Sequence, residues 1–519
     1  MTNLLSTDVL ILGSGIAGAT TALALADAGI PVTVVTRATR PEDTNTYWAQ
    51  GGIIYKGDDD SPALLAEDIT RAGAGHSNPE AVRILAEEGP AAVREVLLDR
   101  VDVPFDLAAD GDLSLALEGG HSLPRIIHAT DATGKAIEIG LIQAMDAHPN
   151  ITLLTGHTAV DLLTPSHHSE DRLSVYQPRS CVGAYLLDQA KGEVRRCVAK
   201  MTVLATGGLG QIFLRSTNPA GSRGDGMAMA DRAEARIINA EFVQFHPTAF
   251  FRQGAVRFLV SEAVRGAGAR LVHADGEPFM QNHDAKWKDL APRDVVARSI
   301  HREMLARDVN NVYLDLRSYV PRDEILHHFP TIYEQSLEFG VDITEDLVPV
   351  VPAAHYSCGG VWVDEWGQTT LRNLYAVGEV ACTGLHGANR LASTSLLEGL
   401  VWGRRAAEHI RANLSAQTLY DADLIPSWAV TGDAVADPAL LTQDMSVIKH
   451  IMWNYVGLVR TGPRRVARSA RLESEIGELT APAAHRRSHR STQRRAQLPS
   501  SSPMQRGRTR RAWGVIIAE

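Results

Sequence analysis

The stretch Val9-Leu10-Ile11-Leu12-Gly13-Ser14-Gly15-Ile16-Ala17-Gly18 decides the fold of this chain. Its four leading apolar residues are typical of a buried parallel strand, and the small apolar residues that continue to Ala28 predict a helix. A second apolar run, Val32 to Val35, predicts the next strand. In such a βαβ unit the first glycine of Gly-x-Gly-x-x-Gly makes the turn, the second lets a diphosphate approach, and the third lets helix and strand pack closely. The free amides at the helix start would bind that diphosphate.

The end of the second strand departs from the usual pattern. An acidic residue normally stands there and binds the ribose hydroxyls, but this chain has Thr36-Arg37. Arg37 could instead meet a phosphate. The motif therefore predicts a dinucleotide site, and taken alone it does not separate FAD from NADP.

Later segments of the chain return to the same kind of pattern. Val203 to Gly208 reads as a strand that runs into glycines, and Leu374 to Val380 reads as another strand, with Gly378-Glu379 at its end. Between them, Asp225 is expected as the N-cap of a helix that begins near Met227. These returns predict an α/β fold whose nucleotide domain is built from distant parts of the chain. The expected nucleotide domain is 1–236 with 355–415, and the expected inserted domain is 237–354.

The charge of the chain is strongly uneven. Residues 479–519 hold nine arginines, no lysine and one glutamate, a net charge of +8, so the rest of the net −10 chain carries −18. An acidic body argues against general nucleic-acid binding. The tail shows no apolar periodicity, and we expect it to be disordered or the product of a reading-frame change. A genuine basic tail that binds nucleic acid is the alternative.

Other classes of protein are disfavoured by composition. The four cysteines lack Cys-x-x-Cys spacing, so they indicate reduced thiols in a cytoplasmic protein, and no metal site is expected. Residues 1–7 carry no basic side chain, so a secretory signal is not expected. The apolar stretch from Val9 to Ile30 is broken by glycines and Asp27, which argues against a membrane span.

Seven short blocks share their order and spacing with one group of flavoproteins. They are residues 13–18, Thr46-Tyr47-Trp48-Ala49-Gln50-Gly51-Gly52, Glu118-Gly119-Gly120-His121-Ser122, Gln244-Phe245-His246-Pro247-Thr248, Pro292-Arg293-Asp294, His355-Tyr356-Ser357-Cys358-Gly359-Gly360 and Gly387-Ala388-Asn389-Arg390-Leu391-Ala392-Ser393. Over about residues 8 to 478 the chain resembles the flavoprotein subunits of succinate dehydrogenase and fumarate reductase, and most closely the L-aspartate oxidases. The resemblance implies a Rossmann-like FAD-binding domain, an α+β capping domain in the inserted segment, and a helical C-terminal region. Residues 416–478 would begin that region, which would be incomplete.

Two positions discriminate within this group. Succinate dehydrogenases carry a histidine, linked covalently to FAD, at the place where this chain has Asn45. An amide cannot form that bond, so the resemblance implies non-covalent FAD. Glu118 stands in a block of the aspartate oxidase type, where the acid meets the substrate ammonium. A dicarboxylate without an amino group would leave that acid unpaired.

The resemblance implies oxidation of L-aspartate to iminoaspartate, with oxygen or fumarate as the electron acceptor. This would be the first step of NAD biosynthesis from aspartate, with a functional link to quinolinate synthase. A soluble fumarate reductase or succinate dehydrogenase-like flavoprotein is the alternative. No membrane partner is expected.

The same blocks supply the expected substrate site. Arg390 can grip a carboxylate through two parallel hydrogen bonds, and His246 and His355 can each donate one. The expected further contacts are Gln244, Glu118 and Ser261, which stands where the group usually has threonine.

Arg293 leaves two interpretations open. It stands just after Pro292, which suits a first helical turn, where a cation opposes the helix dipole. It could be exposed and paired with Asp294. In the resemblance it is the proton donor or acceptor, and we expect that role. Because guanidinium groups stay protonated in most proteins, such a role needs a neighbouring acid.

The expected flavin contacts span much of the chain. We expect three groups of contacts. The first would hold the diphosphate, and the second would run along the ring and ribityl chain. The third adds polar anchors and the start of a helix whose amides could stabilise negative charge on the reduced ring. They are Gly13, Ser14, Gly15, Ile16, Ala17 and Gly18; Asn45, Thr46, Ala49, Gln50, Gly51 and Gly52; and Arg37, Asp225, Glu379, Ser395 and Leu396.

Overall fold

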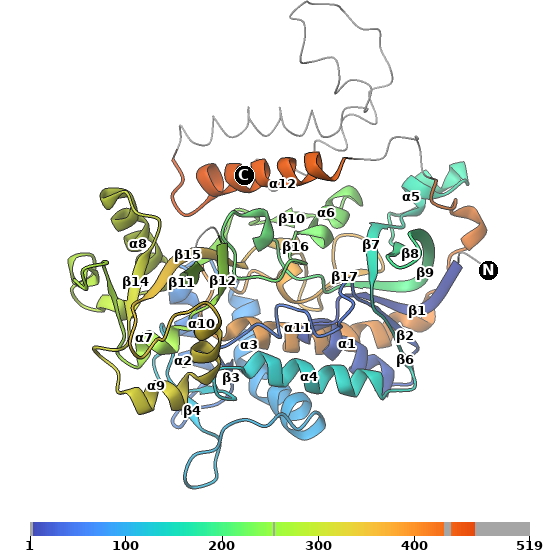
Figure 1. Cartoon of the computed structure of the whole chain (residues 1–519). Helices are drawn as coiled ribbons and strands as arrows, with labels where there is room; N and C mark the ends of the chain where they lie inside the picture. The colour runs from blue at the N-terminus through green and yellow to red at the C-terminus, as the bar shows by residue number, and fades with distance from the viewer. Residues whose placement is uncertain (1–3, 253–254, 430–436, 462–519) are drawn as a thin grey trace, which may run out of the picture.

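The computed structural model describes residues 4–252, 255–429 and 437–461. Its elements form a seven-stranded sheet with helices on both faces and a second, five-stranded sheet beside it (Figure 1). The expected basic tail, 479–519, lies outside the described residues, as do residues 462–478.

The larger sheet is built from segments far apart in the chain. Its order is β6 (Ile151–Leu154), β2 (Val32–Val35), β1 (Leu4–Leu12), β9 (Glu193–Leu204), β8 (Gly183–Asp188) and β7 (His157–Leu162), and β17 (Leu374–Ala376) also pairs with β9. The pairs around β1 are parallel, with Val9 opposite Val32 and Met201, whereas β7, β8 and β9 pair antiparallel. The two segments expected to return to the nucleotide domain, before residue 208 and near residue 374, are thus neighbours of β1 or its partner.

Side chains along β1 alternate between the two faces of the larger sheet, and both faces are covered by helices. Val9 and Ile11 are buried in the core on one face, and Leu10 and Leu12 are buried in the core on the other. The first core lies against α1 (Ile16–Asp27), α2 (Pro62–Ala72), α3 (Pro79–Ala92), α4 (Thr133–Asp146) and α11 (Thr394–Asn413). The second lies against α6 (Asp225–Arg232) and α12 (Pro438–Val456). A strand buried on both faces needs the continuous apolar run seen in the sequence.

The smaller sheet and its helices form a separate core. The sheet order is β12 (Ala255–Leu259), β11 (Val243–Arg252), β15 (Val348–Ser357), β14 (Val312–Asp315) and β13 (Arg270–Val272), antiparallel throughout. Its helices are α7 (Glu262–Gly266), α8 (Arg293–Arg307), α9 (Arg322–His328) and α10 (Pro330–Glu338), seen at the left in Figure 1. The strands and helices of this unit span Val243 to Ser357, where the sequence led us to expect an inserted domain over 237–354.

Short elements complete the fold. Two three-stranded sheets are formed by β10 (Ile237–Ile238), β16 (Gly360–Trp362) and β18 (Ala381–Cys382), and by β3 (Ile53–Ile54), β5 (Ile126–Ile127) and β4 (Leu115–Ala116). A single-turn helix, α5 (Pro165–His168), follows β7 after two residues, and a π-helical segment, Val93–Arg100, directly continues α3. No helix in the described ranges is long and apolar enough to cross a membrane.

Some element boundaries differ from the sequence-based expectation. The strand expected from Val9 begins at Leu4, and the first helix begins at Ile16, directly after the second glycine. Asp225 is the first residue of α6 and not its N-cap, because Gly224 in the left-handed region (φ 80°) takes that place.

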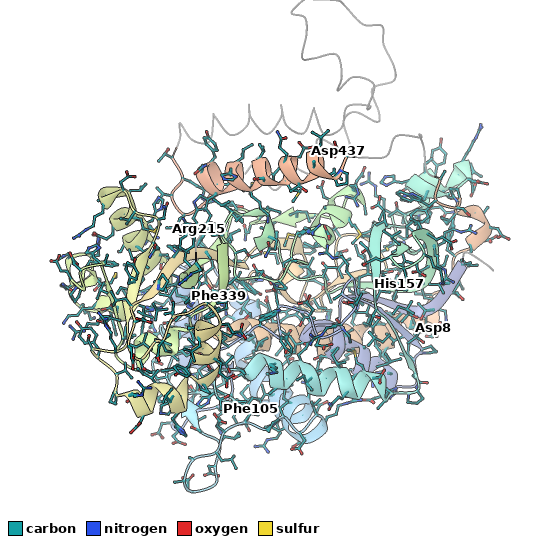
Figure 2. All side chains as sticks on the ribbon, viewed as in Figure 1. Asp8, Phe105, His157, Arg215, Phe339 and Asp437 are labelled. Carbon is teal, nitrogen blue, oxygen red and sulfur yellow. The ribbon has the colours of Figure 1, made fainter. Side chains whose placement is uncertain are left out.

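Helix α12 packs across the larger unit close to the start of the smaller sheet. Trp453 on α12 meets the ring of Phe245 on β11 edge to face, with centroids 5.8 Å apart. The guanidinium of Arg215 lies over both Trp453 and Phe251, at 5.3 and 5.2 Å from the ring centroids, and Figure 2 labels Arg215 at this junction. The helix is therefore fixed to the strand that carries Gln244 and His246.

Candidate active site

One continuous cavity of about 350 Å³ connects the glycine loop with the arginine-rich end of the site. Its walls come from both the larger and the smaller unit. Of the expected flavin contacts it is lined by Gly13, Ser14, Gly15, Ile16, Ala17, Arg37, Asn45, Thr46, Ala49, Gln50, Gly51, Gly52, Asp225, Glu379, Ser395 and Leu396, and of the expected substrate contacts by Glu118, His246, Ser261, Arg293, His355 and Arg390. The structure thus brings together residues that lie far apart in the sequence: Gly13 and Leu396, which both line the cavity, are 383 positions apart.

The glycine loop fits a dinucleotide. A Cβ on Gly13, whose φ is 120°, would lie 2.0 Å from the backbone oxygen of Ala205 on the neighbouring segment, and one on Gly18 would lie 2.1 Å from the oxygen of Gly13. Both contacts exclude any side chain, so the turn, the start of α1 and the end of β9 are packed backbone to backbone. Gly18 does this packing and does not line the cavity, whereas Gly15 does. The start of α1 therefore faces an open cradle suited to a diphosphate.

Arg37 and Asp225 meet at the cavity wall. Arg37 donates from Nη1 to Asp225 Oδ2 at 3.1 Å and from Nη2 to the oxygen of Ala220 at 3.1 Å. Each is partly exposed, so the pair is held weakly and either group can turn towards a ligand. An acid from the start of α6 thus pairs with the arginine that follows β2, where the usual acid is missing.

Asn45 is fixed by hydrogen bonds on both sides of its amide. Its Nδ2 donates to Glu379 Oε2 at 2.7 Å, and its Oδ1 accepts from Asn218 Nδ2 at 3.2 Å and Ser222 Oγ at 3.1 Å. Glu379 also accepts from the backbone amide of Ser357 at 2.9 Å. Burial raises the pKa of Glu379 to about 7, against these hydrogen bonds. The residue at the place of the covalent histidine is therefore part of a polar network along the cavity.

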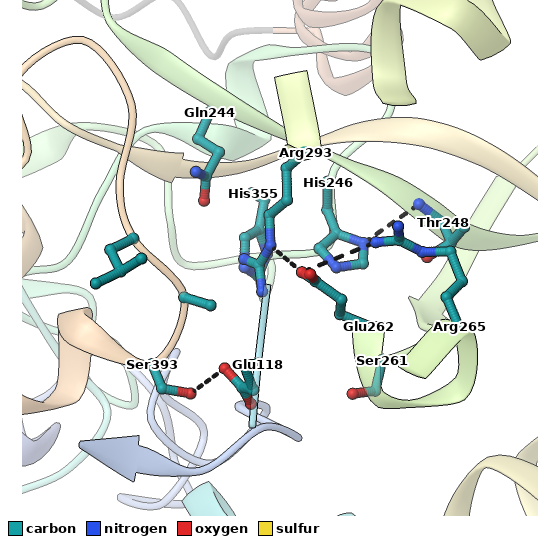
Figure 3. Close-up of polar contacts among 12 residues, drawn as sticks. Glu118, Gln244, His246, Thr248, Ser261, Glu262, Arg265, Arg293, His355 and Ser393 are labelled. Atoms are coloured by element: carbon teal, nitrogen blue, oxygen red, sulfur yellow. Dashed lines mark hydrogen bonds and ion pairs between the residues drawn. The ribbon is translucent and has the colours of Figure 1, made fainter. Parts of the chain in front are cut away.

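Arg293 begins α8 and faces a buried acid that the sequence did not single out. Its Nε donates to Glu262 Oε2 at 2.6 Å, and the Arg293 side chain is only 11% exposed (Figure 3). Arg265 Nη2 lies 3.8 Å from the same oxygen. Burial opposes the charge on Glu262, but the two guanidinium groups outweigh it and lower the pKa of this carboxyl. The exposed pairing of Arg293 with Asp294 is wrong, because Asp294 binds Arg298 at 2.6 Å instead.

The position of Glu262 explains how a cation is tolerated at the first turn of α8. A carboxylate that begins α7 compensates the charge of Arg293, which would otherwise oppose the dipole of α8. The Nη1 of Arg293 is buried and has no hydrogen-bond partner among the described residues. An unpaired buried donor of this kind is costly, and an anionic ligand would satisfy it.

Arg390 lies in the loop before α11 and meets neutral groups. Its Nη1 donates to Ser395 Oγ at 3.1 Å and its Nη2 to His355 Nε2 at 3.1 Å. Burial, and next the charge of Arg293, lower the pKa of Arg390 to about 10, which still leaves it protonated at neutral pH. Its Nε is buried without a partner in the part of the chain that the structure describes.

The two histidines have different hydrogen-bonding roles. His355 Nε2 accepts from Arg390, so its proton lies on Nδ1, 2.9 Å from Thr217 Oγ1. Contrary to expectation, His355 thus has no donor free in this arrangement. His246 Nδ1 accepts from the amide of Thr248 at 3.2 Å, which places the proton on Nε2. Burial, then the neighbouring positive groups, lower both histidine pKa values well below 6.5, so both rings are neutral.

Glu118 lines the cavity on the side opposite to Arg293 (Figure 3). It is half-buried, and its Oε2 accepts a hydrogen bond of 2.6 Å from Ser393 Oγ (Figure 3). The loop that carries it is anchored behind: Ser122 donates from both its amide and its hydroxyl to Asp68 Oδ2 at 2.9 Å, and the buried Arg125 pairs with Asp68 at 3.2 Å. Glu118 is therefore held as an acceptor, with room for a further donor.

Two expected substrate contacts serve other residues. Gln244 is not on the cavity wall; its Nε2 donates to Asn389 Oδ1 at 2.7 Å and to the oxygen of Arg390 at 2.8 Å. Its geometry suits a residue that positions the Arg390 loop. Ser261 lines the cavity, and its hydroxyl also accepts from the amide of Ala263 at 3.3 Å as the N-cap of α7.

Sequence reasoning missed Glu262, Arg265 and Ser393 as site residues. Glu262 directly follows Ser261, and the need of Arg293 for an acid was itself a sequence-level indication that a nearby carboxylate existed. Nothing in the sequence linked that need to Glu262, because the two residues lie 31 positions apart and meet only in the folded chain.

Solved structures share this fold. A variant of E. coli quinol fumarate reductase FrdA superposes with a TM-score of 0.82 at 27% identity, covering 92% of this chain and 83% of the other. Sdh1 of Mycobacterium smegmatis gives a TM-score of 0.74 at 30% identity, covering 91% and 80%. The family model "FAD binding domain" matches residues 8–396.

Curated relatives agree over most of the chain. L-aspartate oxidase 1 of Ralstonia nicotianae is 46% identical, covering 91% of this chain and 88% of that protein. The L-aspartate oxidase of Pseudomonas aeruginosa is 42% identical, covering 91% and 87%, and the chloroplastic L-aspartate oxidase of Arabidopsis thaliana is 43% identical, covering 91% and 73%. With its cavity built from the FAD-binding and substrate blocks together, the chain belongs to the FAD-dependent L-aspartate oxidase family.

Proposed function

We propose that this protein is an FAD-dependent oxidase that converts L-aspartate to iminoaspartate. The observation that carries the proposal is the charge pattern of one cavity, which is lined by a carboxylate, Glu118, and by two guanidinium groups, Arg293 and Arg390. L-aspartate carries one ammonium and two carboxylates, so this arrangement is complementary to all of its charged groups.

Binding is assigned to the groups that meet no direct counter-ion. Arg390 can exchange its neutral acceptors, Ser395 and His355, for a substrate carboxylate, which is a stronger hydrogen-bond acceptor. His246, fixed as a donor at Nε2, contributes a neutral hydrogen bond. Glu118 accepts from the ammonium beside Ser393 and so orients the α-carbon.

Proton movement is assigned to Arg293 and Glu262. The 2.6 Å contact between Arg293 Nε and Glu262 Oε2 supplies the acid that a guanidinium needs before it can act in proton transfer. Arg265, buried beside Glu262, stabilises the carboxylate between two cations. Oxidation releases a proton from the substrate ammonium, and Arg293 can take up this proton once Glu262 has accepted the guanidinium proton.

The chemistry that bound FAD would supply is acceptance of a hydride from the α-carbon and transfer of the electrons to oxygen or fumarate. The residues that would hold it are the glycine loop, the 45–52 segment, Arg37, Asp225, Glu379 and the start of α11. We propose that it is held without a covalent bond, since Asn45 offers an amide that is already engaged by Glu379. Acid precipitation should release all of the flavin into the supernatant, and flavin retained in the pellet would contradict this.

The test of the function is peroxide formation by the purified, flavin-loaded protein. Hydrogen peroxide should form with L-aspartate, and succinate should not replace it. Because the structure resembles that of fumarate reductase, a succinate dehydrogenase-like activity is the second candidate function. Flavin reduction by succinate but not by aspartate would establish that candidate and contradict ours.

The product suggests a place in metabolism. We propose that iminoaspartate is consumed by quinolinate synthase in NAD biosynthesis. A coupled assay with that enzyme should form quinolinate only when aspartate and this protein are both present, and quinolinate formed equally without this protein would contradict the link.

A further inference from the structure

A buried polar cluster lies next to Arg390, and one of its members, Tyr356, also lines the cavity. Its centre is Glu398, in the first half of α11, which is 1% exposed. Its other members are Tyr356, at the end of β15 next to His355, and Thr383 and His386, in the loop after β18. These four residues come from three segments and form what we call the Glu398 cluster.

Hydrogen bonds satisfy the carboxylate of Glu398 on both oxygens. Thr383 Oγ1 donates to Oε1 at 2.6 Å, and the Tyr356 hydroxyl and His386 Nε2 each donate to Oε2 at 2.9 Å. Burial opposes ionisation, but His386 and these hydrogen bonds outweigh it and lower the pKa of Glu398. A fully buried negative charge is thus kept within the fold, at a cost that needs a reason.

The ring of Tyr356 stands between this charge and Arg390. The guanidinium carbon of Arg390 lies 4.8 Å from the centroid of the Tyr356 ring, within the range of a cation–π contact. A phenol that donates to a carboxylate has a more electron-rich ring and a fixed orientation, so it attracts a cation over its face more strongly. Among the described residues no carboxylate forms an ion pair with Arg390, and the contact with Tyr356 links Arg390 to the buried charge of Glu398.

The contact with Tyr356 leaves the N–H groups of Arg390 available to a substrate carboxylate. A carboxylate paired directly with Arg390 would occupy the same in-plane N–H groups that a substrate carboxylate needs. The Tyr356 ring, whose centroid lies 4.8 Å from the guanidinium carbon, offers these N–H groups no carboxylate acceptor. Among the described residues, these N–H groups meet the neutral acceptors Ser395 and His355, which a carboxylate can displace.

We propose that Glu398 is a positioning residue for substrate binding: through the Tyr356 hydroxyl and ring it holds Arg390 in place and balances its charge while leaving its N–H groups to a substrate carboxylate. This inference deepens the proposed function and rests on it for the identity of the substrate. It assigns Glu398 to the affinity for dicarboxylates and not to the chemical step.

The test uses flavin-loaded protein and succinate, a dicarboxylate whose binding is followed by the change in flavin absorbance. The variants are Glu398→Gln, Tyr356→Phe and the double variant. The matched control is Glu408→Gln, an exposed carboxylate on the same helix. The Kd for succinate should rise about tenfold in Glu398→Gln and about threefold to tenfold in Tyr356→Phe. The double variant should be no weaker than Glu398→Gln, because both changes break one connection.

Steady-state kinetics and thermal unfolding separate positioning from a merely structural role. In Glu398→Gln the KM for aspartate should rise with the succinate Kd, while kcat at saturation stays within about threefold of wild type. If the variant contained less flavin or unfolded at a lower temperature, but its flavin-loaded fraction bound succinate with an unchanged Kd, the proposal would be overturned. The proposal would also be overturned if the succinate Kd of the double variant rose by the product of the two single effects.

Two further outcomes are distinguishable. If Glu398→Gln does not fold, Tyr356→Phe decides alone, and a succinate Kd within about twofold of wild type then contradicts the inference. If the wild-type protein binds succinate but does not oxidise aspartate, the proposed function fails, and the comparison of succinate Kd values still tests the role of Glu398.

Discussion

Arg293 and Arg390 line the same cavity, but within the part of the chain that the structure describes only Arg293 touches a carboxylate. Its Nε lies 2.6 Å from Glu262, whereas the N–H groups of Arg390 meet Ser395 and His355, and the Tyr356 ring separates Arg390 from Glu398. A guanidinium in direct contact with an acid is equipped to exchange a proton. One that has neutral partners along its edge is equipped to bind an anion. The difference in partners divides the site into an end for proton transfer and an end for binding.

The largest effect is expected at the proton-transfer end. Arg293→Lys should lower kcat for aspartate by about a thousandfold, because an ammonium cannot reproduce the planar contact with Glu262 while facing the substrate. Steady-state peroxide formation measures this. A loss of less than about tenfold would show that Arg293 does not take part in proton transfer.

The acid behind Arg293 should matter nearly as much. Glu262→Gln keeps the shape but removes the proton acceptor, so kcat should fall by about a hundredfold with little change in KM. Asp294→Asn is the matched control, because Asp294 stands directly after Arg293 but pairs with the partly exposed Arg298. The same loss in both variants would mean that the effect comes from the start of α8 in general.

At the binding end the effect should appear in affinity. Arg390→Lys should raise the KM for aspartate about thirtyfold, since a lysine loses the two parallel hydrogen bonds to a carboxylate. The fall in kcat should be smaller. Succinate titration of the same variant should show a parallel loss, and an unchanged succinate Kd would remove Arg390 from the binding end.

Glu118 tests which substrate the binding end selects. In Glu118→Gln, aspartate oxidation should fall about tenfold more than fumarate reduction by the reduced flavin, because only aspartate presents an ammonium to this carboxylate. The ratio of the two activities is the measured quantity. Equal losses would argue against the contact with the ammonium.

The sequence predicted the frame of the molecule more fully than its site. The apolar run of β1, the glycines and the helix of α1 are local patterns, and the structure has each of them, with Val9 and Leu10 buried on opposite faces as a doubly covered strand requires. Glu262 and Glu398 could not be placed in this way, because a carboxylate acquires its role from partners brought to it by other segments. Gln244 shows the converse: its block was recognised, but its side chain supports the Arg390 loop.

The smallest expected effect concerns stability against pH. His246 is buried and its pKa is well below 6.5 in the folded protein, whereas an unfolded histidine titrates near about 6.5. Below that pH the unfolded state binds more protons, so the stability contributed by the neutral His246 is full above about pH 6.5 and is lost as the pH falls. His246→Gln should therefore reduce the slope of unfolding free energy between about pH 6.5 and 5.5, by up to about 1.4 kcal/mol per pH unit. Denaturant unfolding at both pH values measures it, and identical slopes would contradict a neutral His246.

The division of the site is tested most directly by rapid-mixing measurements of flavin reduction by aspartate. The limiting rate reports the chemical step, and its dependence on aspartate concentration reports binding. Arg293→Lys should lower the limiting rate with an apparent Kd within about threefold of wild type, and Arg390→Lys should raise the apparent Kd with a much smaller change in the limiting rate. If both variants lose rate and affinity in the same proportion, the two arginines act as one unit and the division proposed here is wrong.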